Sequence, residues 1–411
     1  MAESSVETTI APEPTLGVWI IVALGVLTAL GPFAIDLYLP ALPAIARDLH
    51  SDNGAAQRTV AIFFLGMALG QPVHGPLSDR FGRRLPLFGG LAVFTLSSIG
   101  CALAPSMEFL TAMRFLQALG GCAGVVVARA IVRDRFQPRD TVRVFATLTL
   151  ILGVSPILAP LFGGYILLVS DWRTIFLLLA ALGAVMLAAT YFLLIESRSD
   201  ETAALARSES PWRSYKALIA NPHVMGFVLV GAFAGAAMPT YVSCAPSVLI
   251  GGYHVSPTMF GWYFGVNGAG LIAATQVNGY LSRSYRPDLI LKIANRIALG
   301  VALIMLLNAF TGFGGMWGVV VPLFLMCVSM GFNQSNALAG AMAEDPLRAG
   351  ATAALVGATQ FAVGAVCSTI ASAYLDGSAR PMALMISATI AVAVILFAVM
   401  RPHTTHFGGR P

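Results

Sequence analysis

Two ionisable residues stand inside long apolar segments of this 411-residue chain. Asp36 lies in the first apolar segment, and Arg114 lies in the fourth. An ionisable side chain at the centre of a membrane helix costs about 2.5–3.5 kcal/mol on insertion scales and usually marks a functional site. At about 1.5 Å of rise per residue, both lie roughly 10 Å below the same end of their segments. The pair predicts either a proton and substrate site in one polar cavity, or a structural ion pair or snorkelling residue.

The sequence around Asp36 adds aromatic side chains and backbone breaks. Phe33 and Tyr38 flank the acid, and prolines stand at positions 32, 40 and 43. Proline removes a helical hydrogen bond, so the prolines predict a kink or an end of the helix here. Phe33 is as well explained by core packing as by ligand contact, whereas the Tyr38 hydroxyl needs a polar partner.

The second half of the chain offers neutral polar residues within its apolar segments: Asn267, Gln276, Asn278, Asn308, Asn333, Gln334, Asn336 and Gln360. Most are expected to form hydrogen bonds between helices, worth roughly 0.6 kcal/mol each. A few would line a substrate cavity. For that cavity we expect Phe33, Tyr38, Gln117, Asn267 and Gln360.

A charged loop follows the second apolar segment and reads Gly-Pro-Leu-Ser-Asp-Arg-Phe-Gly-Arg-Arg from position 75. Glycines permit a tight turn, and basic residues suit an anionic membrane surface. An acid among bases pairs with one of them or docks on the N-terminus of a neighbouring helix. We expect a gate on this face, made between the halves or with a neighbouring helix, by Gly75, Asp79, Arg80, Gly82 and Arg83.

Motifs for other kinds of chemistry are absent from the sequence. It contains no His-Glu-x-x-His, no Gly-x-Ser-x-Gly and no phosphate-binding loop, so we expect neither an enzyme nor a cofactor. His403 and His406 have metal-like spacing without further ligands, and we expect a solvated tail and no metal. The five cysteines fall in apolar stretches and predict small buried side chains.

The composition shows what must position these residues. Hydrophobic residues make up 57% of the chain and charged residues 10%, and the mean hydropathy is +0.80. A soluble domain carries roughly 25% charged residues, so a soluble fold is excluded. The long apolar runs do not alternate as barrel strands do, and the basic residues form no nucleic-acid face. The sequence predicts an all-α membrane protein.

The apolar runs predict twelve transmembrane helices, since a span needs about 20 mainly apolar residues. The first is expected to remain as a helix, because residues 1–15 are acidic and unlike a cleaved signal. The expected spans are 17–42, 56–76, 85–104, 107–132, 142–169, 173–195, 222–250, 258–282, 288–310, 315–342, 350–375 and 380–401.

Charge in the loops predicts the orientation. Of the 24 lysines and arginines, 19 fall on one side and 4 on the other, with Arg114 inside a helix. The positive side is cytoplasmic. We therefore expect a cytoplasmic tail at 1–16, a six-helix bundle at 17–195, a cytoplasmic linker at 196–221, a second bundle at 222–401 and a tail at 402–411. Gly, Leu and Ser recur after helices 2 and 8 at an offset of 204 residues, which suggests duplication.

Several motifs resemble those of the major facilitator superfamily. The charged loop is similar to its helix 2–3 signature, and Leu-Thr-Ala-Met-Arg-Phe-Leu-Gln from position 110 is similar to its helix 4 signature. Residues 153–164 resemble the helix 5 signature of its drug–proton antiporters, with Ala159 where glycine is common. Residues 34–43 and 243–250 are similar to the bicyclomycin and chloramphenicol-type efflux subfamily. The helix 5 packing residues would be Gly153, Pro156, Pro160, Gly163 and Gly164.

The resemblance implies two pseudo-symmetric six-helix bundles and a proton-coupled antiporter. It would export small, mostly apolar drugs or antibiotics across the bacterial inner membrane by alternating access, with the proton gradient as energy source. Asp36 and Arg114 would carry proton coupling. We expect a monomer whose partners are the drug, protons and the bilayer. The alternative is a proton-coupled symporter or exporter of a small metabolite on the same fold.

Overall fold

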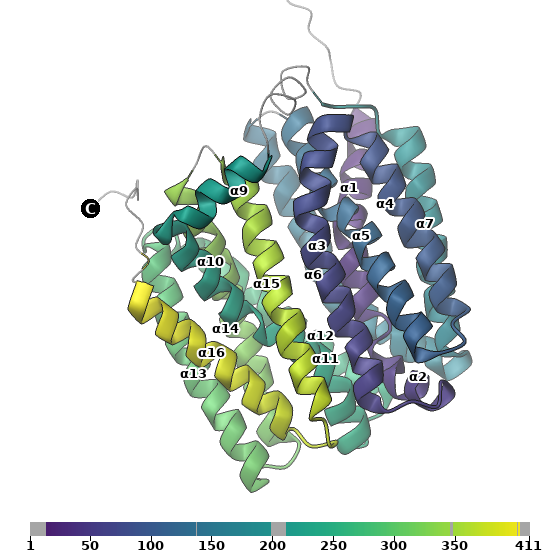
Figure 1. Ribbon diagram of the computed structural model, residues 1–411, viewed down its shortest axis with the longest axis vertical. Coiled ribbons are helices and arrows are strands. Elements are labelled where there is room, and N and C mark those ends of the chain that lie inside the picture. Colours follow the sequence, from purple (N-terminus) through teal and green to yellow (C-terminus); the bar gives the residue numbers. More distant parts are fainter. Residues whose placement is uncertain (1–13, 137, 199–210, 346–347, 401, 403–411) are drawn as a thin grey trace, which may run out of the picture.

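The computed structural model describes residues 14–136, 138–198, 211–345, 348–400 and 402. The elements described in the first half of the chain are all helical (Figure 1). They are α1 (Pro14–Asp36), the 3-10 helix η1 (Leu39–Ala41), α2 (Leu42–Asp48), α3 (Asn53–Phe81), α4 (Arg84–Ala102), α5 (Met107–Arg135), α6 (Pro138–Val169) and α7 (Trp172–Leu193).

The described second half is helical too, and it contains the only π-helix found in the described ranges. Its elements are α9 (Pro211–Ala220), α10 (Pro222–Gly235), α11 (Ala237–Pro246), the π-helix η2 (Ser247–Gly252), α12 (Pro257–Leu281), α13 (Pro287–Thr311), α14 (Trp317–Glu344), α15 (Ala349–Ala373) and α16 (Arg380–Met400).

Short polar side chains start several of these helices. Asp52, Ser106, Asp171 and Ser256 each accept a hydrogen bond from the backbone N–H three residues later. Such caps satisfy amide groups that have no partner in the first helical turn. They fix where α3, α5, α7 and α12 begin and therefore where their buried polar residues lie.

Eleven helices among the described residues are long and apolar enough to cross a membrane. The long helix α12 is outside that set, although it has 25 residues and packs between α6 and α14. Two polar residues, Asn267 and Asn278, are buried on it. With α12, the described helices match the predicted fold class of a helical membrane protein.

Two of the predicted helices are interrupted in the structure. The first was predicted as one helix over 17–42, but α1 ends at Asp36 and a 3-10 turn precedes α2. Pro40 is the second residue of that turn and Pro43 is the second residue of α2, and in the first turn of a helix a missing N–H group costs least. The seventh, predicted over 222–250, is divided into α10, α11 and η2. The predicted linker 196–221 also contains a helix, α9, whose Leu218 is fully buried.

The two halves meet along two pairs of helices. The first-half helix α3 packs on α15, and α6 packs on α12 (Figure 1). A Cβ added at Gly54 would meet the carbonyl oxygen of Ser372, and one added at Gly164 would lie 2.8 Å from the carbonyl oxygen of Pro257. Close packing thus joins the halves at one end. The predicted domain boundaries stay a prediction, since 1–13, 199–210 and 403–411 lie outside the described residues.

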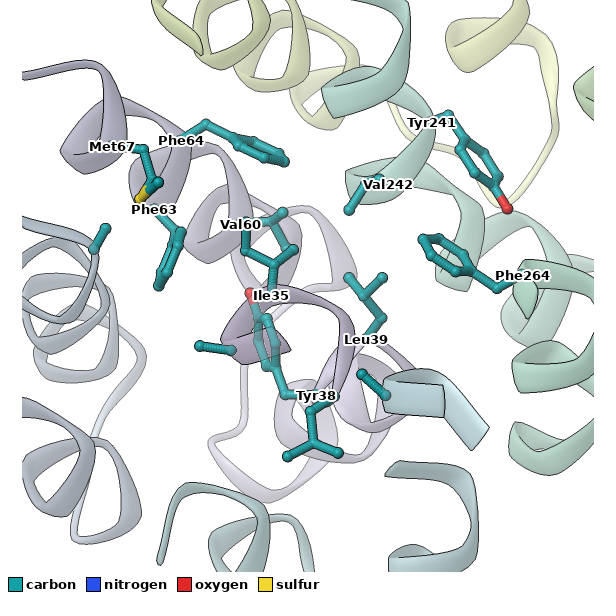
Figure 2. Packing of buried hydrophobic residues seen from close by; sticks show 14 of the residues in the cluster. Ile35, Tyr38, Leu39, Val60, Phe63, Phe64, Met67, Tyr241, Val242 and Phe264 are labelled. Atoms are coloured by element: carbon teal, nitrogen blue, oxygen red, sulfur yellow. The ribbon is translucent and has the colours of Figure 1, made fainter. Parts of the chain in front are cut away.

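A single apolar cluster crosses between the halves at that end. Ile35 and Leu39 from the first half belong to it, as do Val242 and Phe264 from the second. Figure 2 shows Leu39 beside Val242 and Phe264. All four side chains are at most 5% exposed. This cluster covers the end of α1 where Asp36 lies.

Candidate functional site

Arg114 lies fully buried in an aromatic enclosure. Its guanidinium carbon is 4.0 Å from the centroid of the Tyr38 ring and 4.2 Å from that of Phe63, with Phe176 at 5.7 Å. Cation–π contacts of this kind contribute about 2 kcal/mol or more when desolvated. The rings hold the cation in the membrane-spanning region without a carboxylate partner among the described residues.

Hydrogen bonds fix the guanidinium further. Its Nη1 donates to the carbonyl oxygen of Ala34 at 3.2 Å and to Oε1 of Gln117 at 2.5 Å. Gln117 in turn donates from Nε2 to Ser98 Oγ at 2.7 Å. The Arg114 Nε and Nη2 atoms have no hydrogen-bond partner among the described residues. Arg114 therefore connects α5 to α1 and, through Gln117, to α4, while its Nε and Nη2 groups remain available as donors.

Tyr38 completes this arrangement at the end of α1. Its hydroxyl shares a 2.9 Å hydrogen bond with Thr59 Oγ1, and its ring packs on Phe176 at 5.7 Å. The side chain is fully buried. The predicted need of Tyr38 for a polar partner is thus met by α3. Phe33, by contrast, is half-buried and packs against the edge of the apolar cluster.

Asp36 is the only buried carboxylate among the described residues, at 7% exposure. Within the described ranges its side chain forms neither a hydrogen bond nor an ion pair. It lies near enough to Tyr241 of α11, in the other half of the protein, for its charge to act on that side chain. Asp36 therefore lies where the two halves meet.

Asp36 and Arg114 do not form an ion pair in this conformation. Arg114 is held instead by the backbone carbonyl of Ala34 in α1 and by the ring of Tyr38, which lies in the turn after α1 ends at Asp36. The structural ion pair that the sequence left open as an alternative is therefore not formed between these two residues, and their role in coupling stays a prediction.

The other expected cavity residues lie apart from this enclosure. Asn267 of α12 is 5% exposed and donates from Nδ2 to the Tyr241 hydroxyl at 2.8 Å, and Tyr241 stacks on Phe264. Gln360 of α15 lies against Gly235 of α10. Asn267 thus joins the Tyr241 group near Asp36, whereas Gln360 packs within the second half. The sequence analysis did not identify Phe63, Phe176 or Tyr241 as site residues. Only Tyr241 could have been singled out, because a hydroxyl group in an apolar segment needs a polar partner.

The charged loop forms a network around Arg83, whose side chain is 1% exposed. Its Nε donates to Asp134 Oδ2 at 2.7 Å, and its Nη1 donates to Ser78 Oγ at 2.9 Å and to Asp79. Burial would lower the pKa of the Arg83 guanidinium, but the hydrogen bonds to Asp134 and Asp79 outweigh it and raise that pKa. Of the two expected kinds of gate contact, the structure has the one with a neighbouring helix, α5.

A third carboxylate, Glu196, completes this network from the chain after α7. Its Oε1 accepts from the backbone N–H of Arg83 at 2.8 Å, and its Oε2 accepts from that of Arg84 at 3.2 Å. Gly82 has φ +91° at this turn, and a Cβ there would strike the carboxylate. The expected acid on a helix N-terminus is thus Glu196 on α4 and not Asp79.

The other expected gate residues have smaller parts. The Gly75 carbonyl accepts from Ser78 Oγ at 3.0 Å, and a Cβ at Gly75 would meet nothing within 4 Å. Arg80 is exposed, and its carbonyl accepts from Arg198 Nη1 at 2.6 Å. Neither residue reaches the second half. The network therefore braces the first half internally, and the chain after α7 is part of it.

The helix 5 packing residues lie in α6, between α1 and α12. A Cβ added at Gly163 would strike the Leu37 carbonyl. One added at Gly268 of α12 would lie 3.3 Å from the Pro156 side chain. One added at Gly153 would lie 3.0 Å from Ile272, and the Pro160 carbonyl lies 2.8 Å from the Cβ position of Gly261. Ala159 is fully buried, so alanine is accommodated there. This segment brings backbone to backbone at the joint between the halves.

Comparison with known proteins agrees with this geometry. The family description Major Facilitator Superfamily matches residues 24–372. The chain belongs to that superfamily. It is therefore a transporter and not an enzyme. The aromatic enclosure of Arg114, the buried Asp36 and the Arg83 network therefore belong to a multi-pass membrane protein with a transport fold.

Individual relatives cover most of the chain. The "Uncharacterized MFS-type transporter YdgK" of Bacillus subtilis (strain 168) is 34% identical over 381 residues, 91% of this chain and 93% of the relative. The "Bicyclomycin resistance protein homolog" of Haemophilus influenzae is 30% identical over 377 residues, 92% of this chain and 94% of the relative. The "Multidrug resistance protein MdtL" of Escherichia coli is 33% identical over 224 residues, 54% of this chain and 56% of the relative.

Solved structures show the same fold at low identity. A bacterial homolog of the human lysosomal transporter Spinster, in an inward-facing and occupied conformation, has TM-score 0.73 at 15% identity, covering 96% of this chain and 98% of its own. The D-xylose–proton symporter has TM-score 0.71 at 14% identity, covering 95% and 98%. Together with the family match, these likenesses confirm the predicted major facilitator fold.

Proposed function

We propose that this major facilitator protein is a proton-coupled antiporter that exports small, mostly apolar drugs or antibiotics across the bacterial inner membrane. Asp36 carries the proposal, as the only buried carboxylate of the described residues and one without a partner. Its position between the halves supports a role in coupling. The drug-resistance names of the relatives at 30% and 33% identity support the substrate class.

The proposed cycle uses the joint between the halves. A buried charge without a partner is costly, so opening the outer apolar cluster and changing the proton occupancy of Asp36 are linked. A proton entering from outside would neutralise Asp36 and favour drug release, and its loss to the cytoplasm would restore the site. Arg114 would act as a positioning residue, because it holds the end of α1 through Ala34 and Tyr38.

Transport in reconstituted vesicles tests the proposal. Ethidium efflux driven by an imposed pH gradient should fall at least tenfold in Asp36→Asn, with ethidium binding retained. Asp376→Asn is the matched control, because this carboxylate lies exposed in the α15–α16 loop, and it should export normally. Wild-type efflux by Asp36→Asn would overturn proton coupling at this residue. Proton-driven accumulation with the substrate moving alongside the proton would favour the symporter instead.

The proposed orientation has its own test. Single cysteines at Ser170 and Ser284 would probe exposed positions at opposite ends of the molecule. The native cysteines are all buried, so they should react little with the labelling reagent. In intact cells an impermeant maleimide should label Ser170→Cys and should not label Ser284→Cys until the membrane is opened. The reverse pattern would contradict cytoplasmic termini.

A further inference from the structure

A cavity of about 480 Å³ lies between α13 and α16, away from Asp36 and Arg114. On α13 it is lined by Leu289, Lys292, Asn295 and Arg296, whose spacing places them on one side of the helix. On α16 it is lined by Val394 and Phe397 among others. It sits at the end of the molecule that the loop charges assign to the cytoplasm.

The cavity carries two uncompensated positive charges. Lys292 and Arg296 are exposed, stand four residues apart, and form no ion pair with any described residue. Asp288 also lines the cavity, but its Oδ1 accepts from Arg286 Nε at 3.1 Å. Because Arg286 offsets Asp288, the cavity is net positive and complements an anion.

A buried amide at the cavity supplies an independent observation. Asn295 is 1% exposed, and neither its Oδ1 nor its Nδ2 has a hydrogen-bond partner in the described structure. A buried polar group left unpaired destabilises the folded protein, so such groups are rare without a role. An occupant with oxygen atoms near Asn295 would satisfy the amide.

The surroundings of the cavity indicate an occupant with apolar tails. Apolar side chains next to it face outward from α13 and α16, with Ile293 50% exposed, Ile297 57%, Ile395 60% and Val399 73%. In a membrane-spanning protein these surfaces contact acyl chains. Basic pockets between transmembrane helices on the cytoplasmic side suit anionic lipid headgroups.

We propose that this cavity binds the headgroup of an anionic phospholipid from the cytoplasmic leaflet. Lys292 and Arg296 hold the phosphate, Asn295 hydrogen-bonds to the headgroup, and the acyl chains lie along α13 and α16. The site depends on the orientation of the chain and is independent of what the protein transports.

Lipid binding to the purified full-length protein tests the site. Native mass spectrometry and thermal unfolding in detergent would be followed while dioleoylphosphatidylglycerol, dioleoylphosphatidylcholine or sodium phosphate is added. We expect one phosphatidylglycerol to bind and raise the unfolding temperature, with little effect of phosphatidylcholine. Lys292→Gln with Arg296→Gln should weaken phosphatidylglycerol about 25-fold, since each basic residue contributes about fivefold. Equal effects of both lipids, or an effect of sodium phosphate alone, would overturn the proposal.

Two further variants separate a specific site from general surface charge. Arg213→Gln with Lys216→Gln removes one arginine and one lysine from α9 and should leave phosphatidylglycerol affinity unchanged. An equal loss in that control would mean diffuse attraction and would overturn the proposal. Asn295→Leu should weaken the lipid several-fold while leaving the unfolding temperature in phosphatidylcholine the same or higher. Unchanged lipid affinity in this variant would exclude the amide from the site.

Discussion

Arg114 stacks on Tyr38, with 4.0 Å between the guanidinium carbon and the ring centroid, and forms no ion pair with Asp36. The stack joins α5 to the turn that follows α1, two residues after Asp36. Arg114 therefore holds this region in place through contacts with Ala34 and Tyr38 that do not involve the Asp36 carboxylate.

The stack predicts a sharp difference between two substitutions of Tyr38. Tyr38→Phe keeps the ring and loses only the hydrogen bond to Thr59, worth about 1 kcal/mol. Tyr38→Leu loses the cation–π contact as well, worth about 2 kcal/mol in a desolvated site. We expect near-normal efflux in Tyr38→Phe and a loss of more than tenfold in Tyr38→Leu. Similar efflux by both variants, at equal amounts of folded protein, would contradict this role.

Arg114 itself allows a graded test. Arg114→Lys keeps the charge and can still donate to Ala34 and Gln117, but it lacks the planar group that stacks between Tyr38 and Phe63. Partial efflux is expected, between wild type and Arg114→Ala. The rates would be measured in vesicles of equal protein content. Full efflux activity of Arg114→Lys would show that transport needs the positive charge at this position and not the stacking of the guanidinium on the rings.

In the Arg83 network, Asp134 and Asp79 are predicted to contribute unequally to the free energy of unfolding. The Asp134 side chain is 12% exposed, whereas that of Asp79 is 40% exposed. Breaking a buried pair costs about 3–5 kcal/mol, and breaking an exposed one about 0–1 kcal/mol. Asp134→Asn should therefore lower the unfolding temperature more than Asp79→Asn does.

The same two variants test the gate. Both should raise the reactivity of a cysteine placed at the exposed Arg133 position and slow turnover, and Asp134→Asn should do so more strongly. A larger effect of Asp79→Asn would show that contacts outside this network, made in another conformation, dominate. Unchanged reactivity in both variants would mean that the network has no part in gating.

Glu196 predicts a pH dependence of stability. Burial opposes its ionisation, but bonds from the backbone N–H groups of Arg83, Arg198, Arg84 and Ser197 hold the pKa of this carboxyl below its ordinary value. A lowered folded-state pKa contributes stability that is complete above the unfolded value of about 4.3 and is lost as pH falls through the folded value. Glu196→Gln should therefore unfold at lower temperature than wild type at pH 7, and the gap should narrow below about pH 4. A constant gap would assign the effect to packing.

The sequence predicted these sites unequally, for physical reasons. A buried charge is visible in any apolar segment, so Asp36 and Arg114 could be singled out. The rings of Phe63 and Phe176 come from α3 and α7, and nothing local marks them as partners of Arg114. Glu196 stands in a polar stretch where solvent exposure is the ordinary expectation, so its docking on α4 could not be predicted. The break after Asp36 was predictable from Pro40 as a kink or an end, but the 3-10 turn that follows depends on packing against α6 and α12.

Two glycines in different helices, one tightly packed and one in open space, predict different effects of a glycine-to-alanine substitution. A methyl group at Gly163 would strike the Leu37 carbonyl, where neither backbone can yield without moving α6 from α1. Overpacking of this kind costs about 1–3 kcal/mol. A methyl group at Gly300, inside α13, would meet nothing within 4 Å, and alanine favours the helix by up to about 1 kcal/mol. Gly163→Ala should lower the unfolding temperature and Gly300→Ala should raise it or leave it unchanged. Because Leu37 adjoins Asp36, Gly163→Ala should also slow proton-driven efflux at temperatures where the protein stays folded, and normal efflux there would show that this contact serves packing alone.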